Sequence, residues 1–257
     1  MELLAKYGNE EQKKQWLQPL MAGKIRSAYV MTEIDVAASD AKNLSLDMRR
    51  EGDSYILNGV NVRVPASNII LGESRGFEIM QGRMGPGRIH HCMRAIGCAE
   101  RGLDYMIARA HKRMIHGAPL ADKGVVASWI AQSRIDIESA RLLTLNAADK
   151  IDRTSAKDAK TEIAVAKIAV PNLALAVLDR AIQAHGAAGI SQDFPLARIW
   201  AYLRTVRFAD GPDEAHAAQL ARTESKRHKN IIDLIAAQET ARRSLMNKYK
   251  CTPRSHL

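Results

Sequence analysis

The sequence predicts a mainly α-helical protein, in which a short β remnant precedes a C-terminal domain of the four-helix-bundle type. Aromatic residues make up only 5% of the 257 residues, whereas strands are usually enriched in aromatic and β-branched residues. Several long segments with apolar residues near helical spacing follow one another from residue 77 onward. Consecutive long helices are typical of an antiparallel bundle.

The first element expected is a helix over residues 9–22. Asn9 is a suitable N-cap, and Glu10 and Glu11 lie in the first turn, where negative charge stabilises a helix. Gly23 follows the last apolar residue and indicates the end of the helix.

Residues 26–65 are expected to form an incomplete β domain. Short apolar runs alternate with turn residues, including Glu51-Gly52-Asp53, and predict two or three strands. So few strands leave exposed edges, which is an unstable arrangement for a complete domain. The residues alone therefore indicate a fragment.

Residues 66–245 are expected to form the helical domain, and residues 246–257 a disordered tail. The helix expected over residues 157–185 is apolar nearly all round, which is typical of a buried helix, and Pro171 should kink it. We also expect a disturbance of the first long helix at Gly85-Pro86-Gly87. The expected helices span residues 77–115, 122–151, 157–185, 195–208 and 213–243.

The composition indicates which kinds of ligand the protein is expected to bind and in which kind of cellular compartment it is expected. The net charge of +10 attracts anions, but the basic residues are not interleaved with aromatic residues, so nucleic acid is not expected. The three cysteines, Cys92, Cys98 and Cys251, have no spacing typical of a disulfide framework or zinc site, which favours a reducing compartment. His90 and His91 have no acidic or cysteine partner at a metal-ligand spacing nearby, so no metal site is expected. No apolar run is long enough to span a membrane.

Three short motifs could bind a ligand, although each has an ordinary structural interpretation. Residues 31–40, MTEIDVAASD, form a polar turn that could bind an anion or be a plain loop. Residues 183–189, QAHGAAG, could let a backbone approach a ligand or could simply cap a helix. Residues 210–214, DGPDE, precede a helix whose N–H groups suit a phosphate, or Asp213 could serve only as a cap.

Taken together and in this order, the motifs resemble the acyl-CoA dehydrogenase family along nearly the whole chain. TEIDVAASD is similar to the family's TEPxxGSD turn, and QAHGAAG, followed by SQDFPLAR, to its flavin loop. RGFEIMQGRMGPGRIHHCMR and ADGPDEAH resemble most the branch called family members ten and eleven.

The resemblance implies an FAD-dependent oxidoreductase of fatty acid β-oxidation. In the family a carboxylate removes the α-proton of an acyl-CoA thioester, hydride leaves from the β-carbon to the flavin, and a trans-2-enoyl-CoA results. It also implies an electron-accepting flavoprotein or oxygen as oxidant, and a homo-oligomer, dimer or tetramer, because the flavin loop reaches a neighbouring subunit.

The resemblance assigns a role to individual residues. Asp210 is the expected base, one methylene shorter than the usual glutamate, with Glu100 as a weaker candidate. Substrate contacts are expected from Ser39, Gly85, Pro86, Gly87, Arg88 and Gly211. Flavin contacts are expected from Met31, Thr32, Ser39, Arg113, Gln183, Gly186, Ala187, Ala188, Gly189, Pro212, Asp213 and Glu214.

The sequence departs from the family in one way that bears on function. Most of the middle β domain, including a segment that lies against the flavin, is missing between Gly59 and Asn61, and residues 1–25 resemble only the end of the N-terminal helical domain. The alternative is therefore a truncated, catalytically impaired form that acts as a helical oligomerisation or binding module. The final Ser255-His256-Leu257 is similar to a peroxisomal address, with the mitochondrion as the alternative location.

Overall fold

The structure is a computed structural model that describes residues 1–28, 32–37, 40, 43–58, 62–226 and 228–250. It begins with short helical segments, α1 (Glu2–Tyr7), α2 (Glu10–Gln12), the π-helical η1 (Lys13–Leu17) and α3 (Gln18–Met21). The side chain of Asn9 accepts a hydrogen bond from the Gln12 N–H, and the Gln12 side chain accepts one from the Asn9 N–H. This capping box confirms Asn9 as the N-cap.

The β remnant consists of three short antiparallel strands, β1 (Met48–Glu51), β2 (Ser54–Leu57) and β3 (Val62–Pro65). Strand β2 lies in the middle of the sheet, and Glu51 pairs with Ser54 across the predicted turn. Gly52 supplies a positive φ of +58° at that turn. Tyr55 is the buried residue of these strands, so the sheet has little core of its own.

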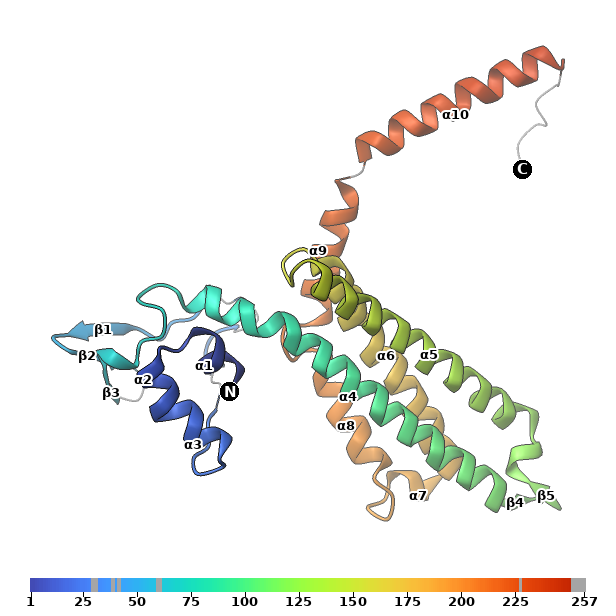
Figure 1. Ribbon diagram of the computed structural model, residues 1–257. Helices are drawn as coiled ribbons and strands as arrows, with labels where there is room; N and C mark the ends of the chain where they lie inside the picture. The colour runs from blue at the N-terminus through green and yellow to red at the C-terminus, as the bar shows by residue number, and fades with distance from the viewer. Residues whose placement is uncertain (29–31, 38–39, 41–42, 59–61, 227, 251–257) are drawn as a thin grey trace.

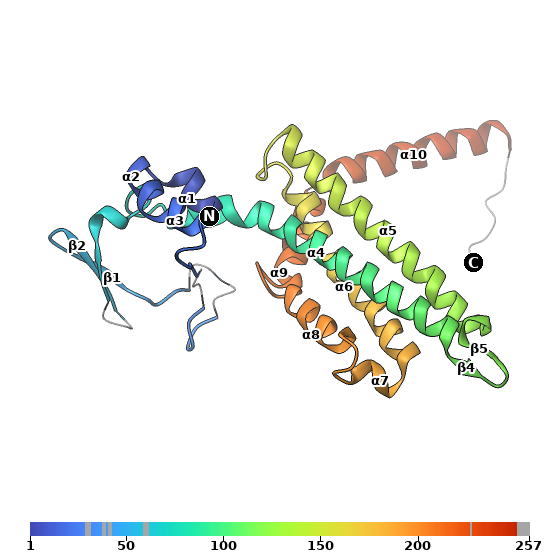
Figure 2. The ribbon, with the colours of Figure 1, turned by 60° about the horizontal axis from the view of Figure 1, so that its bottom comes forward.

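A 3₁₀ turn, η2 (Ala66–Asn68), leads from the sheet into the long helix α4 (Gly76–Lys112). The buried Gln12 side chain donates hydrogen bonds to the carbonyl oxygens of Ser67 and Ile69, at 2.8 and 3.0 Å. These contacts join the N-terminal helices to the segment that precedes α4. In Figures 1 and 2 the N-terminal helices and the sheet gather around the start of α4.

The bundle is built around α6 (Lys160–His185), which packs against α4, α5 (Gly124–Arg153), α8 (Leu196–Val206) and α9 (Asp213–Ser225). A small hairpin, β4 (Met114–Ile115) and β5 (Ala118–Pro119), and the 3₁₀ turn η3 (Leu120–Asp122) connect α4 to α5. The short α7 (Ala187–Ile190) follows α6. Figure 1 shows α4, α5 and α6 side by side along most of their length.

Helix α6 is the core helix that the sequence predicts. Val170, Val177, Leu178 and Ala181 are all fully buried in it. Among the described residues, α6 is the one helix whose length and composition would allow it to cross a membrane. More than half of its most apolar stretch is, however, buried inside the bundle. Its apolar character is therefore accounted for by packing against four neighbouring helices.

The structure corrects two of the predicted boundaries. The single helix predicted over residues 213–243 is wrong, because α9 ends at Ser225 and a separate α10 spans His228–Lys248. Helix α10 also includes residues 246–248, which the sequence placed in the tail. Helix α10 projects away from the bundle (Figures 1 and 2).

The disturbance predicted at Gly85-Pro86-Gly87 does not interrupt the helix. Helix α4 runs through Pro86 without a break, and the residues on either side of the proline are helical. Gly85 lies where an added Cβ would be 2.9 Å from the Cβ of Ala156. The small residue therefore lets the loop between α5 and α6 approach α4 closely.

Candidate active site

The turn between α8 and α9 has an unusual backbone. Asp210 and Gly211 both have positive φ, +56° and +103°, and such a conformation costs a non-glycine residue about 1–3 kcal/mol. Three side chains hold its carbonyl groups. Arg88 donates from Nε to the Asp210 oxygen at 3.1 Å, and Nε2 of His216 lies 3.3 Å from the same atom. Lys167 donates from Nζ to the Gly211 oxygen at 3.1 Å.

The Asp210 side chain points toward α4. Its Oδ1 lies 3.4 Å from Nη1 of Arg83, and its Oδ2 lies 3.2 Å from Nε2 of His91. Oδ2 is buried and accepts no hydrogen bond of good geometry. A Cβ added to Gly87 would lie 3.3 Å from Oδ2. The absence of a side chain at Gly87 therefore lets α4 approach this oxygen closely.

Opposing effects set the charge of Asp210. Burial acts to raise the pKa of its carboxyl, but His91 and the guanidinium groups of Arg83 and Arg88 outweigh burial, so the pKa lies below its usual value. The group is therefore ionised at neutral pH, as a base must be, although a lowered pKa makes it a weaker base.

The predicted contacts around Asp210 come together only in part. Gly87, Arg88 and Gly211 lie at the carboxylate or its turn, as described above. Asp213 is directed into the protein instead, since its Oδ2 accepts hydrogen bonds from Nε of Arg207 at 2.7 Å and Nδ2 of Asn172 at 3.2 Å. Pro212 precedes the first turn of α9 as its N-cap, and Glu214 is exposed there.

A second group of predicted residues lies at the other end of α4. Arg113, Gln183 and Gly186 line a pocket of about 310 Å³ together with Arg109 and Trp129. Nε of Arg109 is buried and has no hydrogen-bond partner. A buried, unpaired guanidinium N–H beside a second arginine suits an anionic group such as a pyrophosphate, so the residues present fit this part of FAD.

The remaining flavin candidates divide between surface and core. Ala187 is exposed and Ala188 half-buried beside the pocket. A Cβ on Gly189 would lie 2.6 Å from the Ile182 oxygen, so this glycine is required for close packing. Thr32 is exposed. Met31, Ser39 and the junction at Gly59–Asn61 lie outside the described residues, as does the C-terminal Ser255-His256-Leu257.

The two sites lie far apart within one chain. Gly87 and Arg109 are 22 residues apart on α4, which at 1.5 Å per residue corresponds to about 33 Å.

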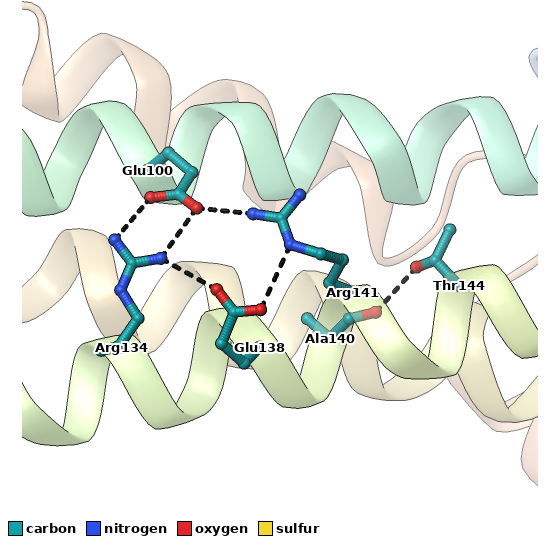
Figure 3. A network of polar contacts seen from close by, with 6 residues as sticks. All are labelled: Glu100, Arg134, Glu138, Ala140, Arg141 and Thr144. Carbon is teal, nitrogen blue, oxygen red and sulfur yellow. Dashed lines mark hydrogen bonds and ion pairs between the residues drawn. The ribbon is translucent and has the colours of Figure 1, made fainter.

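Glu100, the weaker candidate for the base, belongs to an ion-pair cluster between α4 and α5. Its carboxylate accepts hydrogen bonds from Arg134 at 2.9 Å and Arg141 at 2.6 Å, and both arginines also contact Glu138 (Figure 3). The hydrogen bond from Arg134 is the largest cause of its lowered pKa. This environment engages Glu100 within the protein and gives it no contact with Asp210.

Sequence reasoning missed four residues of the Asp210 site, namely Arg83, His91, Lys167 and His216. His91 drew attention only as a metal ligand. Lys167 could have been singled out from the sequence, because it is a charged residue within a helix that is otherwise apolar nearly all round. Arg83 and His216 stand in the motifs that carry the family resemblance, but no role was assigned to them, since their approach to Asp210 depends on tertiary packing.

The geometry defines a helical-bundle protein with a buried carboxylate at one end and an arginine-lined pocket at the other. Comparisons with known proteins identify the family to which it belongs. Residues 74–224 match the acyl-CoA dehydrogenase C-terminal domain. The chain is 44% identical to acyl-CoA dehydrogenase family member 11 of Gallus gallus, over 87% of this chain and 38% of that protein. It is 40% identical to the probable acyl-CoA dehydrogenase FadE2 of Mycobacterium tuberculosis, over 90% of this chain and 73% of that protein.

A solved structure agrees with these relatives. A putative acyl-CoA dehydrogenase from Mycobacterium abscessus has a TM-score of 0.84 and 37% identity, covering 88% of this chain and 72% of that chain. The chain belongs to the acyl-CoA dehydrogenase family, which confirms the resemblance, including its likeness to members ten and eleven. The members of this family are FAD-binding flavoproteins.

The alignments also bear on the missing segment. The match to the Gallus gallus protein extends over 293 residues although it uses only 87% of a 257-residue chain. That relative therefore carries about 70 aligned residues that have no counterpart here. The chain spans 38% of the length of this relative.

Proposed function

We propose that the chain acts as an FAD-dependent acyl-CoA dehydrogenase, which converts an acyl-CoA to the trans-2-enoyl-CoA in fatty acid β-oxidation. The main observation in support is the Asp210 carboxylate, whose buried Oδ2 lies close to Gly87 and 3.2 Å from Nε2 of His91. Bound FAD would accept the hydride from the β-carbon, and an electron-accepting flavoprotein or oxygen would reoxidise it.

The chain's own residues would hold the substrate and move one proton. Asp210, ionised because His91, Arg83 and Arg88 lower its pKa, would take the α-proton onto Oδ2. The partly buried setting would exclude water from this oxygen and so favour proton transfer. Gly87 would leave room for the thioester, and Gly211 would lie beside it in the same turn.

We further propose that a second copy completes the flavin site. The pocket at Arg109, Arg113, Gln183 and Gly186 is about 33 Å from Gly87 along α4, which is too far for one flavin to serve both ends of the same chain. An exposed apolar stripe on α5, formed by Ile135, Leu142 and Leu145, is suited to contact with another subunit. A homodimer or tetramer, measured by sedimentation, is the expected state.

The test is flavin binding followed by flavin reduction. The purified chain with added FAD should gain thermal stability, since a ligand that binds only the folded state stabilises it, and acyl-CoA should bleach the flavin under anaerobic conditions. Asp210→Asn should bind FAD and not bleach it, whereas the matched Glu100→Gln should behave as the wild type does. A chain that stays colourless and gains no thermal stability from FAD would contradict the proposal.

The second candidate function is a non-catalytic oligomerisation or binding module. The observation that favours it is the segment of about 70 residues that a relative has and this chain lacks. A chain that binds no FAD yet forms a stable oligomer, or associates with a full-length family member, would support this function over the first.

We propose a peroxisomal location on the strength of the final Ser255-His256-Leu257, with the mitochondrion as the alternative. A fluorescent protein that carries these three residues at its C-terminus should enter peroxisomes, and diffuse fluorescence would contradict the proposal.

A further inference from the structure

Helix α6 buries a lysine directly beneath the turn that carries Asp210. The side chain of Lys167 is 0% exposed, although lysine is almost never fully buried unless it is paired. Its Nζ donates to the Gly211 oxygen at 3.1 Å and lies 3.8 Å from Oδ1 of Asp213. Lys167 therefore contacts both the turn and the first residue of α9.

Burying the charge of Lys167 costs free energy, which indicates that the ammonium group has a role at this position. Burial lowers the pKa of Lys167, while Asp213 acts most strongly among its neighbours to raise it. An apolar side chain of similar length would fill the same space without the desolvation cost. It would, however, leave the Gly211 carbonyl and Oδ1 of Asp213 without the ammonium group.

The turn depends on contacts of this kind because its backbone is strained. Asp210, a non-glycine residue, lies at φ +56°, a conformation that persists only where its surroundings fix it. Arg88 and His216 hold the Asp210 carbonyl from α4 and α9, and Lys167 holds the next carbonyl from α6. The Gly211 carbonyl belongs to the peptide between Gly211 and Pro212. Releasing it would let this peptide rotate and would free the backbone of Gly211, so that the adjacent Asp210 would lose part of the support that fixes its orientation.

We propose that Lys167 is a positioning residue for Asp210, which fixes the Gly211 carbonyl and so holds the carboxylate between Gly87 and His91. The inference deepens the proposed function, because it concerns the orientation of the proposed base. The described contacts of Lys167 are to the Gly211 oxygen and to Oδ1 of Asp213, so it would act on Asp210 through the turn.

The variant that tests this is Lys167→Met, with Lys160→Met as the matched control at the exposed start of the same helix. With FAD and a straight-chain acyl-CoA, Lys167→Met should lower kcat on the order of 100-fold, the size of effect that a misplacement of about 1 Å can have. KM should stay within about threefold, because binding and chemistry respond separately to such a change. Lys160→Met should leave both unchanged.

A second measurement does not depend on turnover. A ¹³C titration of the aspartate carboxyls, with the Asp210 signal assigned from Asp210→Asn, reports whether the carboxylate still faces His91 and Arg83. In Lys167→Met the pKa of Asp210 should rise toward its ordinary value. If the methionine variant does not fold, Lys167→Gln takes its place in both measurements.

The outcomes separate the two proposals. A wild type that never reduces FAD ends the proposed function, and the titration alone then decides the role of Lys167. An Asp210 titration that is the same in Lys167→Met as in Lys160→Met would overturn the inference. A kcat that falls only in proportion to the unfolded fraction would overturn it as well, because Lys167 would then be purely structural.

Discussion

Gly211→Ala tests how far the Asp210 turn is fixed by its backbone and its neighbours. Gly211 has a φ of +103°, in a region that side chains rarely adopt, and a Cβ there would lie 3.0 Å from Nε2 of His216. The strain alone should cost about 1–3 kcal/mol. Because the new methyl group also displaces the His216 ring from the Asp210 carbonyl, a hydrogen bond worth about 1 kcal/mol is lost too.

The expected loss is therefore about 2–4 kcal/mol in the free energy of unfolding, measured by urea denaturation followed by circular dichroism. The corresponding fall in Tm is roughly 5–10 °C for a chain of this size. Gly72→Ala is the matched control, since Gly72 has the same φ of +103° and open space around it. Equal losses in the two variants would refute the contact with His216, and no loss in either would refute the strain.

Three further predictions concern the core and titration. Leu178→Ala should lower the free energy of unfolding by about 2–5 kcal/mol, since Leu178 is fully buried against Gly102, whereas Leu234→Ala on the exposed α10 should change it by less than about 0.5 kcal/mol. Burial raises the pKa of Cys92 to about 12, so iodoacetamide should label Cys92 only in unfolded protein, and labelling of the native chain would contradict its burial. Burial, with Arg88, lowers the pKa of His216, so the unfolded chain binds more protons than the folded one near pH 6 and stability should rise between about pH 5 and 7. His216→Gln should flatten that rise, and an equally steep curve in the variant would assign it to other groups.

The helices could be predicted largely because apolar periodicity is a local property. Helix α5 (Gly124–Arg153) begins and ends within two residues of the predicted 122–151, and Asn9 caps its helix as its side chain suggested. The separation of α9 from α10 was missed. The residues of α10 are exposed almost throughout, and a helical pattern in the sequence does not reveal whether a face is packed.

The candidate site was less predictable than the fold. Asp210 was proposed through family resemblance, and the turn's composition alone was consistent with a simple helix cap. The partners that define its environment, Arg83 and His91 on α4 and Lys167 on α6, lie from 43 to 127 residues away in the sequence. Their meeting at one turn results from the packing of α4 and α6 against the segment between α8 and α9, which no local pattern encodes.

The separation of the two candidate sites along α4 has a consequence for stoichiometry. If each complete site draws one end from each of two chains, then loss of the segment near one end leaves the other end intact. A mixed pair of one short and one full-length chain would then hold one complete and one defective site. The short chain would therefore halve the number of working centres in such pairs without preventing their assembly.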